Sequence, residues 1–297
     1  MTGQVSQPTY HPETYWARRF ARRLGLSTVG YLGLGWSYNR WLYAARKAAF
    51  LRAVRALPLA VEGAAVLELG VGSGFYLPIW RRLGARRIAG VDITQAAVDR
   101  ARVLCPEGRF ERQDLRRPFD LEERFDIVTG IDVLFHVVDD HGFASALENI
   151  RRHLLPAGRA LVTDCLVEKG ELSAGHVRYR TMDEWRGAFR QQQMEVTDLL
   201  PQLSLMHSGT RQPGIGGMIT GGVIAATFCA ARAGNRVITE LVGAATGALL
   251  YPWEVLATRT GRPAGGSICL MLACPMAERA GGSCFGERQP EKSVPRR

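Results

Sequence analysis

The 297-residue sequence predicts an α/β protein built on a doubly wound, mostly parallel sheet. Between about residues 64 and 166, short apolar runs alternate with segments of helical periodicity, which is typical of parallel strands joined by helices. The first apolar run leads into the glycine-rich stretch ELGVGSGF, residues 68–75, and acidic residues close the next runs. Because ligands of such sheets bind outside the carboxyl ends of the strands, these glycines and acids predict a binding site there.

The individual elements follow from the spacing of apolar residues. Helices are expected directly after the glycines, from the candidate N-cap Thr94 to residue 104, over 139–158 and over 181–191. Strands are expected at 64–69, 86–93, 108–113, 125–131, 159–167, 194–200 and 266–275. Residues 59–202 thus predict the core, and 265–276 supply its final strand.

Residues 1–58 predict a helical cap rich in arginine. In YWARRFARRLG, Trp16, Phe20 and Leu24 share one face while the arginines take the other, which predicts an amphipathic helix with a solvated arginine face. A second helix is expected from about residue 40 to residue 57, with Asn39 as its N-cap. Residues 1–60 carry nine basic residues against one acid, so they hold +8 of the net charge of +10. Such an arm can meet phosphate, anionic lipid or an acidic substrate, and charge alone does not choose among them.

Residues 203–264 differ from the rest of the chain because they are apolar and glycine-rich, with no charge between Arg211 and Arg232. An uncharged segment of that length could form a membrane-spanning helix. Its glycines, its proline and its modest hydropathy instead favour a mobile lid or a substrate-binding insertion over the site. An interfacial patch is the alternative. The tail 277–297 is expected to be disordered.

Composition indicates a globular protein, with 46% hydrophobic and 22% charged residues. The six cysteines form no CxxC pair and no metal-ligand grouping, so neither a metal site nor a redox dithiol is expected. Reduced thiols and the absence of a signal-peptide pattern predict a cytoplasmic protein.

The sequence of the glycine-rich turn discriminates among three candidate cofactors. A P-loop for ATP needs GxxxxGK[ST], and no lysine or threonine follows these glycines. Dinucleotide sites normally use GxGxxG, whereas here the third glycine, Gly74, comes one residue early and Phe75 follows. Adenosine without phosphates, carrying a zwitterionic methionine tail, is the remaining candidate. Asp92, 18 residues after Gly74, can accept hydrogen bonds from both ribose hydroxyls, and Glu68 is placed to hold the ammonium group.

These residues resemble the class I S-adenosylmethionine-dependent methyltransferases. ELGVGSG is similar to their first motif, GVDI to the acid that follows it and RQDL to the motif near adenine. FDIVTGIDVLFHVVDD resembles the fourth motif, and LENIRRHLLPAGRALVTD resembles the helix and strand before the substrate region, with Ala157 replacing a glycine. The resemblance covers about residues 60–200 and the final strand. It implies a Rossmann-like sheet of seven strands whose last strand runs antiparallel.

The resemblance also implies the cofactor, S-adenosylmethionine, and roles for residues at matching positions. The loop glycines Gly70, Gly72 and Gly74 let the backbone approach the methionine part, and Asp92 holds the ribose. Adenine is expected to lie against Ile93 and Leu115 and to donate its amino group to Asp114. Asp132 is expected near the methionine end or the substrate mouth.

Methyl transfer from a sulfonium needs little beyond alignment in a dry site and a base. His136 is the leading candidate for the base, with His176, Tyr179 and His207 behind it. Motifs for nucleic-acid bases, arginine and metal-chelated catechols are missing, so a nucleic-acid partner would depend on charge alone. The cap and the insertion instead predict a small, partly apolar acceptor of secondary metabolism, such as a polyketide, quinone or lipid-like molecule, with Tyr31, Tyr38, Tyr179 and His207 as candidate contacts.

The transfer can be to oxygen, carbon or nitrogen. Three other readings stay open at this point: a membrane-surface enzyme acting on lipid, an RNA methyltransferase, and a protein that binds the cofactor without transferring a methyl group. The sequence indicates no oligomeric state, and weak membrane-surface contact follows only from the arginine-rich cap and the apolar insertion.

Overall fold

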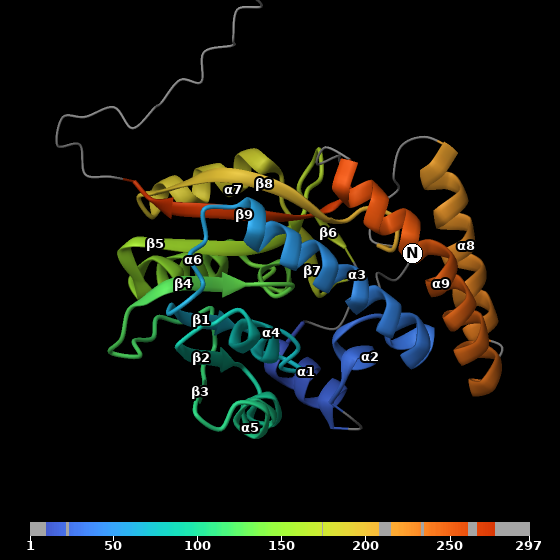
Figure 1. Cartoon of the computed structure of the whole chain (residues 1–297), viewed down its shortest axis with the longest axis horizontal. Coiled ribbons are helices and arrows are strands. Elements are labelled where there is room, and N and C mark those ends of the chain that lie inside the picture. Colours follow the sequence, from blue (N-terminus) through green and yellow to red (C-terminus); the bar gives the residue numbers. More distant parts are fainter. Residues whose placement is uncertain are drawn as a thin grey trace, which may run out of the picture.

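A seven-stranded sheet forms the centre of the molecule (Figure 1). The computed structural model describes residues 10–21, 24–173, 175–207, 215–232, 235–260 and 266–276, and the predicted disordered tail 277–297 lies outside them. The strands of the sheet are β1 (Ala65–Leu69), β2 (Arg87–Asp92), β3 (Arg109–Arg112), β4 (Phe125–Gly130), β5 (Leu154–Cys165), β8 (Met194–Leu203) and β9 (Ile268–Pro275). A separate hairpin pairs β6 (Glu171–Ser173) with β7 (Val177–Tyr179).

The strand order is β3-β2-β1-β4-β5-β9-β8. The first five strands in this order pair in parallel, whereas β9 runs antiparallel to both of its neighbours. The predicted Rossmann-like sheet with an antiparallel last strand is therefore confirmed. The order reverses at β1 and β4, and this switch point is where ligands of open α/β sheets bind.

Helices cover both faces of the sheet because the central strands are apolar on both sides. Val66 of β1 belongs to one core cluster and Leu67 to the other. The cluster with Val66 packs against α3 (Gly35–Ala56), α4 (Leu77–Arg82) and α5 (Gln95–Leu104). The cluster with Leu67 packs against α6 (Asp140–His153) and α7 (Met182–Gln191). The remaining helical elements are α1 (Pro12–Phe20), α2 (Leu26–Val29), η1 (Leu32–Leu34), η2 (Leu134–His136), α8 (Ile215–Arg232) and α9 (Arg236–Thr260).

Of the two predicted N-caps, one is confirmed and the other is wrong. Thr94 accepts a hydrogen bond from the backbone of Ala97, which confirms it as the N-cap of α5. The prediction of Asn39 as an N-cap is wrong, because α3 begins four residues earlier, at Gly35. The side-chain amide of Asn39 is buried. Its oxygen accepts the backbone N–H of Tyr31, and its nitrogen donates to the carbonyl of Tyr31.

Long-range contacts explain the early start of α3. Its first amides, on Trp36 and Ser37, donate to the carboxylate of Glu240, which comes from α9 some 200 residues further along the chain. A carboxylate at a helix N-terminus satisfies orphan donors and complements the helix dipole. A local reading of the sequence does not reveal such a partner.

The described part of residues 203–264 forms the helices α8 and α9, which pack on each other, with α9 also lying along α3 and against β8 (Figure 1). Glu254 anchors α9 by accepting backbone N–H groups of Ser204, Leu205 and Met206. Across the described ranges, no helix combines the length and apolarity needed to cross a bilayer.

Candidate active site

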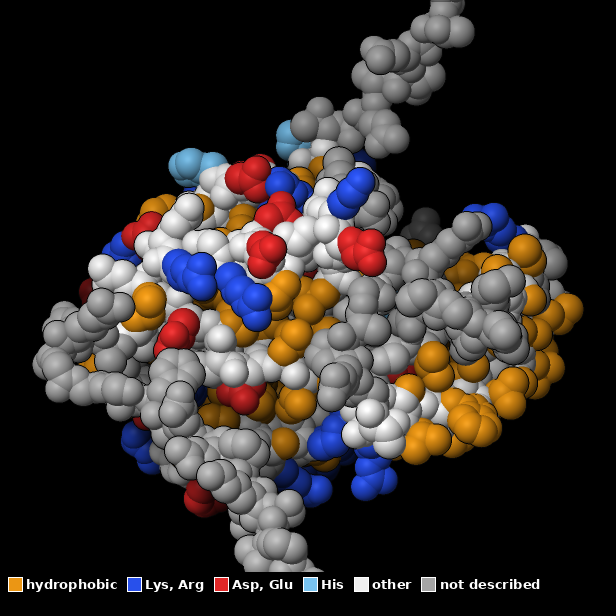
Figure 2. Space-filling model, turned by 90° about the horizontal axis from the view of Figure 1, so that it is seen from above, with side chains coloured by type: hydrophobic (Ala, Val, Ile, Leu, Met, Phe, Trp, Pro, Cys, Tyr) orange, Lys and Arg blue, Asp and Glu red, His pale blue; other side chains and the backbone are white. Residues whose placement is uncertain are grey.

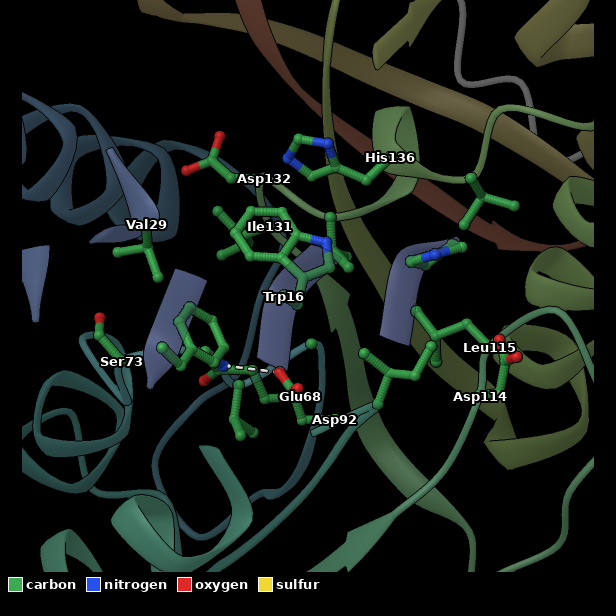
Figure 3. Close-up of a pocket in the computed structure, with 18 of the residues that line it drawn as sticks. Trp16, Val29, Glu68, Ser73, Asp92, Asp114, Leu115, Ile131, Asp132 and His136 are labelled. Atoms are coloured by element: carbon green, nitrogen blue, oxygen red, sulfur yellow. Dashed lines mark hydrogen bonds between the residues drawn. The ribbon is translucent and has the colours of Figure 1, made fainter. Parts of the chain in front are cut away.

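A cavity opens at the carboxyl ends of β1, β2 and β4, at the predicted place (Figure 3). It contains about 900 Å³ of space free of protein atoms, part of it open to solvent. Nine of the ten residues predicted for the cofactor and the base line it, namely Glu68, Gly70, Gly72, Asp92, Ile93, Asp114, Leu115, Asp132 and His136.

The glycine loop after β1 forms the floor of the cavity. Gly70 has φ +71°, and a Cβ there would lie 2.5 Å from a methyl carbon of Val133. Gly72 has φ +49° and donates its N–H to Asp92. Both positions therefore require glycine for the loop to keep this path.

Gly74 departs from the prediction because it does not line this cavity. Its φ is +73°, and a Cβ would lie 2.5 Å from a methyl carbon of Leu104 in α5. This glycine lets the loop pack closely on the neighbouring helix, and its spacing from the other two glycines could not distinguish the two purposes.

Asp92 is buried and already holds three donors. Its Oδ2 accepts the Gly72 N–H at 3.0 Å (Figure 3), and its Oδ1 accepts the backbone N–H and the hydroxyl of Thr94 at 2.9 and 2.8 Å. Burial raises the pKa of Asp92, and these hydrogen bonds oppose the rise. A carboxylate offers about four lone-pair positions. About one position therefore remains for a ligand, which favours one ribose hydroxyl over the predicted two.

Glu68, just before the loop, carries a buried oxygen without a partner. The residue is 3% exposed, and its Oε2 makes no hydrogen bond. Burial, followed by the charge of Asp92, raises the pKa of Glu68 to about 8. An uncompensated carboxylate costs free energy in such a place, and a cationic group beside it would offset that cost.

The far end of the cavity is acidic and apolar at once. Asp114 binds the guanidinium of Arg116, with Nη2 to Oδ2 at 2.7 Å and Nε to Oδ1 at 3.0 Å. Burial raises the pKa of Asp114, but the hydrogen bonds from Arg116 outweigh it and leave this pKa lowered. Ile93 and Leu115 supply apolar walls.

His136 is fixed in one neutral tautomer. Its Nδ1 lies 2.9 Å from the carbonyl oxygen of His176, and because a carbonyl only accepts, Nδ1 carries the proton. Burial lowers the pKa of His136 to about 3, so the ring is neutral at physiological pH and Nε2 keeps its lone pair. The Trp16 ring packs edge-on at 4.9 Å between ring centroids.

Arg46 reaches the same cavity rim from α3 and was not predicted. It pairs with the carboxylate of Asp132, a residue held at φ +57° whose N–H donates to the hydroxyl of Thr163. Arg46 is 7% exposed, so it is not part of a solvated arginine face. Its place among the apolar residues Leu42, Tyr43 and Ala49 was the available signal, because an arginine on a packing face needs a partner.

Helix α1, part of the predicted cap, covers one side of the cavity, although none of its residues was among the predicted site residues. Tyr10, just before α1, and Pro12, Trp16 and Phe20 within it all line the cavity. Arg19 holds the helix by donating to the carbonyl of Gly30 at 2.6 Å and to that of Thr28. The described residues of 203–264 contribute nothing to this lining, so a lid formed by that segment stays a prediction.

The four candidate substrate residues gather in a second cluster, none of them among the residues that line the cavity. The Tyr31 hydroxyl lies 3.0 Å from Nδ1 of His207, and the Tyr179 ring lies 6.0 Å from that of His207. Tyr38 donates to the carbonyl of Met206. Phe135 lies between the two sites, 4.6 Å from the His136 ring and 5.9 Å from the Tyr179 ring. Burial, then the charge of Arg46, lowers the pKa of His207 to about 3.

Comparison with known proteins bears on this arrangement. Residues 66–158 match a family model described as a methyltransferase domain. The segment that contains the glycine loop and the acids after β2 to β4 is therefore similar to methyltransferase domains, the group for which the sequence predicts S-adenosylmethionine as the cofactor.

Individual relatives of the methyltransferase domain are distant. An O-methyltransferase from a trans-AT polyketide synthase multienzyme of Brevibacillus brevis, in complex with S-adenosyl-L-homocysteine, superposes with a TM-score of 0.55 at 14% identity, covering 91% of this chain and 81% of that one. An S-adenosylmethionine-dependent methyltransferase from Mesorhizobium loti gives 0.48 at 17% identity, over 77% of this chain and 99% of that one.

A curated protein also matches a short part of the domain. The ribosomal protein L11 methyltransferase of Aquifex aeolicus (strain VF5) is 37% identical over 68 residues, or 23% of this chain, and the match spans only 28% of that protein's length.

The residues of the methyltransferase domain fit its cofactor. The glycine cradle leaves no room for side chains, the unpaired Glu68 oxygen faces a place suited to a cation, and the acidic ends flank apolar walls. An adenosyl group with a cationic tail offers the matching chemistry, whereas the phosphates of a dinucleotide would meet carboxylates.

Proposed function

We propose that the protein transfers a methyl group from S-adenosylmethionine to a hydroxyl group of a small, partly apolar acceptor. The observation that carries this proposal is His136, a neutral imidazole whose protonated nitrogen is fixed by the His176 carbonyl and which lines the cavity. Its other nitrogen can then accept a hydrogen bond from an acceptor hydroxyl. Because its pKa of about 3 makes it a weak base, we expect it to take the proton only as the methyl group is transferred, when the oxygen becomes strongly acidic.

Within the site, Glu68 would hold the ammonium group and Asp92 one ribose hydroxyl. Ile93 and Leu115 would contact the adenine, and Asp114 would accept from its amino group. When bound, S-adenosylmethionine supplies a methyl group activated by its sulfonium. The protein orients the acceptor, excludes water and takes up the hydroxyl proton at Nε2 of His136.

The acceptor is expected to approach along the rim formed by Asp132, Arg46 and Phe135. Arg46 neutralises Asp132, so this rim presents an ion pair beside aromatic rings rather than a net charge. Beyond Phe135, the cluster of Tyr31, Tyr38, Tyr179 and His207 lies largely buried and backs this rim with aromatic rings, an environment that suits a phenolic or polyketide-like molecule. The polyketide O-methyltransferase of the same fold provides a precedent for this class of acceptor.

The test combines binding with turnover. Titration calorimetry should show that S-adenosylhomocysteine binds the purified protein and that NADH and ATP do not. Incubation with S-adenosylmethionine carrying a trideuterated methyl group and a panel of phenols, quinols and polyketide alcohols should give products heavier by one labelled methyl. Binding of a dinucleotide in place of S-adenosylhomocysteine would refute the proposal. Cofactor binding without turnover on any hydroxylated acceptor, but with labelling of RNA or an amine, would refute the choice of acceptor.

A further inference from the structure

Helix α9 turns small and polar residues inward and large apolar residues outward. Its buried residues are Gly243, Thr246, Gly247, Leu250, Glu254 and Thr258. Its large exposed residues are Val237, Ile238, Leu241, Leu249, Trp253 and Leu256, each between 43% and 66% exposed. They make up six of the ten large hydrophobic side chains that are exposed in the described part of the chain. A surface helix of a globular protein normally shows the opposite arrangement.

The outward residues form one continuous stripe. Ile238, Leu241, Ala245, Leu249, Trp253 and Leu256 are all exposed and follow one another at steps of three or four residues, which places them on a single helical face. We call this stripe the outer face of α9. A helix of 25 residues is about 37 Å long, so the stripe is far more extended than scattered surface leucines. Figure 2 shows hydrophobic side chains gathered at the end of the molecule where α8 and α9 lie in Figure 1.

Apart from two acids bound to backbone N–H groups, the charged residues of α8 and α9 are positive. Both acids of α9 are engaged by backbone N–H groups, Glu240 at the start of α3 and Glu254 after β8. Helix α8 contains no acid. The remaining charged residues of the two helices are Arg232, Arg236 and Arg259, and all three are exposed.

A tryptophan and an arginine extend this surface at the start of α9. Trp36, whose N–H donates to Glu240, is 49% exposed. The guanidinium of Arg40 lies 5.3 Å from the centre of the Trp36 ring. Amphipathic tryptophan and arginine side chains of this kind favour the boundary between water and lipid.

A second copy of the chain fits this face poorly. A two-fold contact between antiparallel copies of α9 would bring Arg236 of one copy toward Arg259 of the other, and neither copy has an outward acid to pair with them. A partner with an apolar layer beneath a negatively charged surface would bury the apolar stripe and pair with the arginines.

We propose that the outer face of α9 docks on the surface of an anionic lipid bilayer, with the stripe in the acyl boundary and the arginines among the headgroups. The helix then lies in the plane of the membrane and does not span it, consistent with its limited hydropathy. This inference goes beyond the proposed function and is measured without methyl transfer, so the two can fail independently.

Flotation of the full-length protein with vesicles tests the proposal. Vesicles of phosphatidylcholine with about one third phosphatidylglycerol should carry the protein to the top of the gradient at low salt, and pure phosphatidylcholine vesicles should carry at least tenfold less. The triple variant Leu241→Gln/Trp253→Gln/Leu256→Gln should lose more than tenfold of the binding. The pair Arg236→Ser/Arg259→Ser should lose about thirtyfold, and only at low salt.

A matched control comes from α5, where Val103 is 72% exposed and lies outside α9. Val103→Gln should bind vesicles like the parent protein, and circular dichroism should show all variants folded. Brominated acyl chains should quench Trp253 fluorescence, so that Trp253→Phe, which keeps an aromatic anchor, reduces the quenching while binding persists. Equal binding by the parent and the triple variant would overturn the proposal. So would a parent protein that ignores anionic vesicles and instead forms a dimer that the triple variant abolishes.

Discussion

The guanidinium of Arg46, in helix α3, pairs with the carboxylate of Asp132, which follows strand β4. The pair joins the helical cap to the sheet at the rim of the cavity, and both side chains are largely buried, at 9% and 14% exposure. Burying two charges is costly unless each satisfies the other, so neither partner is tolerated alone. The cap and the core are thereby coupled at the place where an acceptor would enter.

Replacing Arg46 tests this coupling. Arg46→Met should lower the free energy of unfolding by about 3 kcal/mol, because Asp132 is left as an unpaired, poorly solvated charge. Urea denaturation measures the change. Arg46→Met/Asp132→Asn should recover part of the loss, and Arg81→Met, which breaks the exposed pair with Glu107, should cost no more than about 0.5 kcal/mol. Equal losses from Arg46→Met and Arg81→Met would show that the buried pair has no special weight.

The proposed base can be separated from cofactor binding. His136→Asn should reduce kcat by about 10²- to 10⁴-fold, because the acceptor proton loses its destination, while affinity for S-adenosylhomocysteine changes little. Turnover of a labelled methyl group and calorimetry supply the two readouts. His141→Asn, at an exposed histidine in the first turn of α6, serves as the control and should leave both unchanged. A His136→Asn protein with parental kcat would remove His136 from the chemistry.

Asp92 is expected to serve both the loop and the ligand. Asp92→Ala removes the acceptor of the Gly72 N–H and the remaining position for a ribose hydroxyl, at a cost of about 2 to 3 kcal/mol, or tens of fold to over a hundredfold in affinity for S-adenosylhomocysteine. Calorimetry measures the affinity. Asp99→Ala, in the neighbouring α5 where the exposed side chain binds only Gln95 and Arg102, should bind normally. Unchanged affinity in Asp92→Ala would contradict the assigned role.

Glu68 should make the stability of the cofactor-free protein fall as pH rises from about 5 to about 8. The pKa of Glu68 is raised from 4.5 to about 8 in the folded state, so between these values the folded chain keeps a proton that the unfolded chain has released. Each rise in pH then favours the unfolded state, with a total loss of a few kcal/mol. His136 and His207, whose lowered pKa values act in the opposite direction, titrate only below about 6.5.

Urea midpoints from pH 6.5 to 8.5 check this expectation. Glu68→Gln should flatten the decline over that range, leaving a smaller slope near pH 7 from Asp164, whose pKa burial raises to about 7. A parent protein whose midpoint stays constant from pH 6.5 to 8.5 would rule out a buried, protonated Glu68.

Local sequence patterns predicted most strands and site residues, whereas contacts between residues far apart in the sequence were not predicted. Most strand positions, Gly70, Gly72 and the acids at the ends of β1 to β4 depend on short periodicities, and they lie where expected. The predicted helix over 139–158 is too long, because strand β5 already begins at Leu154. Arg46 looked like one more arginine of a basic cap, because its partner Asp132 is 86 residues away. The capping of α3 by Glu240 and the inverted face of α9 depend on contacts across even longer separations. Gly74 shows the complementary limit, since one spacing serves both a ligand and a neighbouring helix.

Helix α1 has a consequence for the timing of turnover. Its nine residues cover the cavity, and their polar attachments to the rest of the molecule include Arg19 and the exposed pair of Glu13 with Arg112. Trp16 and Phe20 line the cavity, so movement of this short helix would widen the opening through which spent cofactor leaves, and we expect it to contribute to the rate of product release. Helix α1, which lines the cavity where the acceptor is expected, would then also influence the rate of turnover.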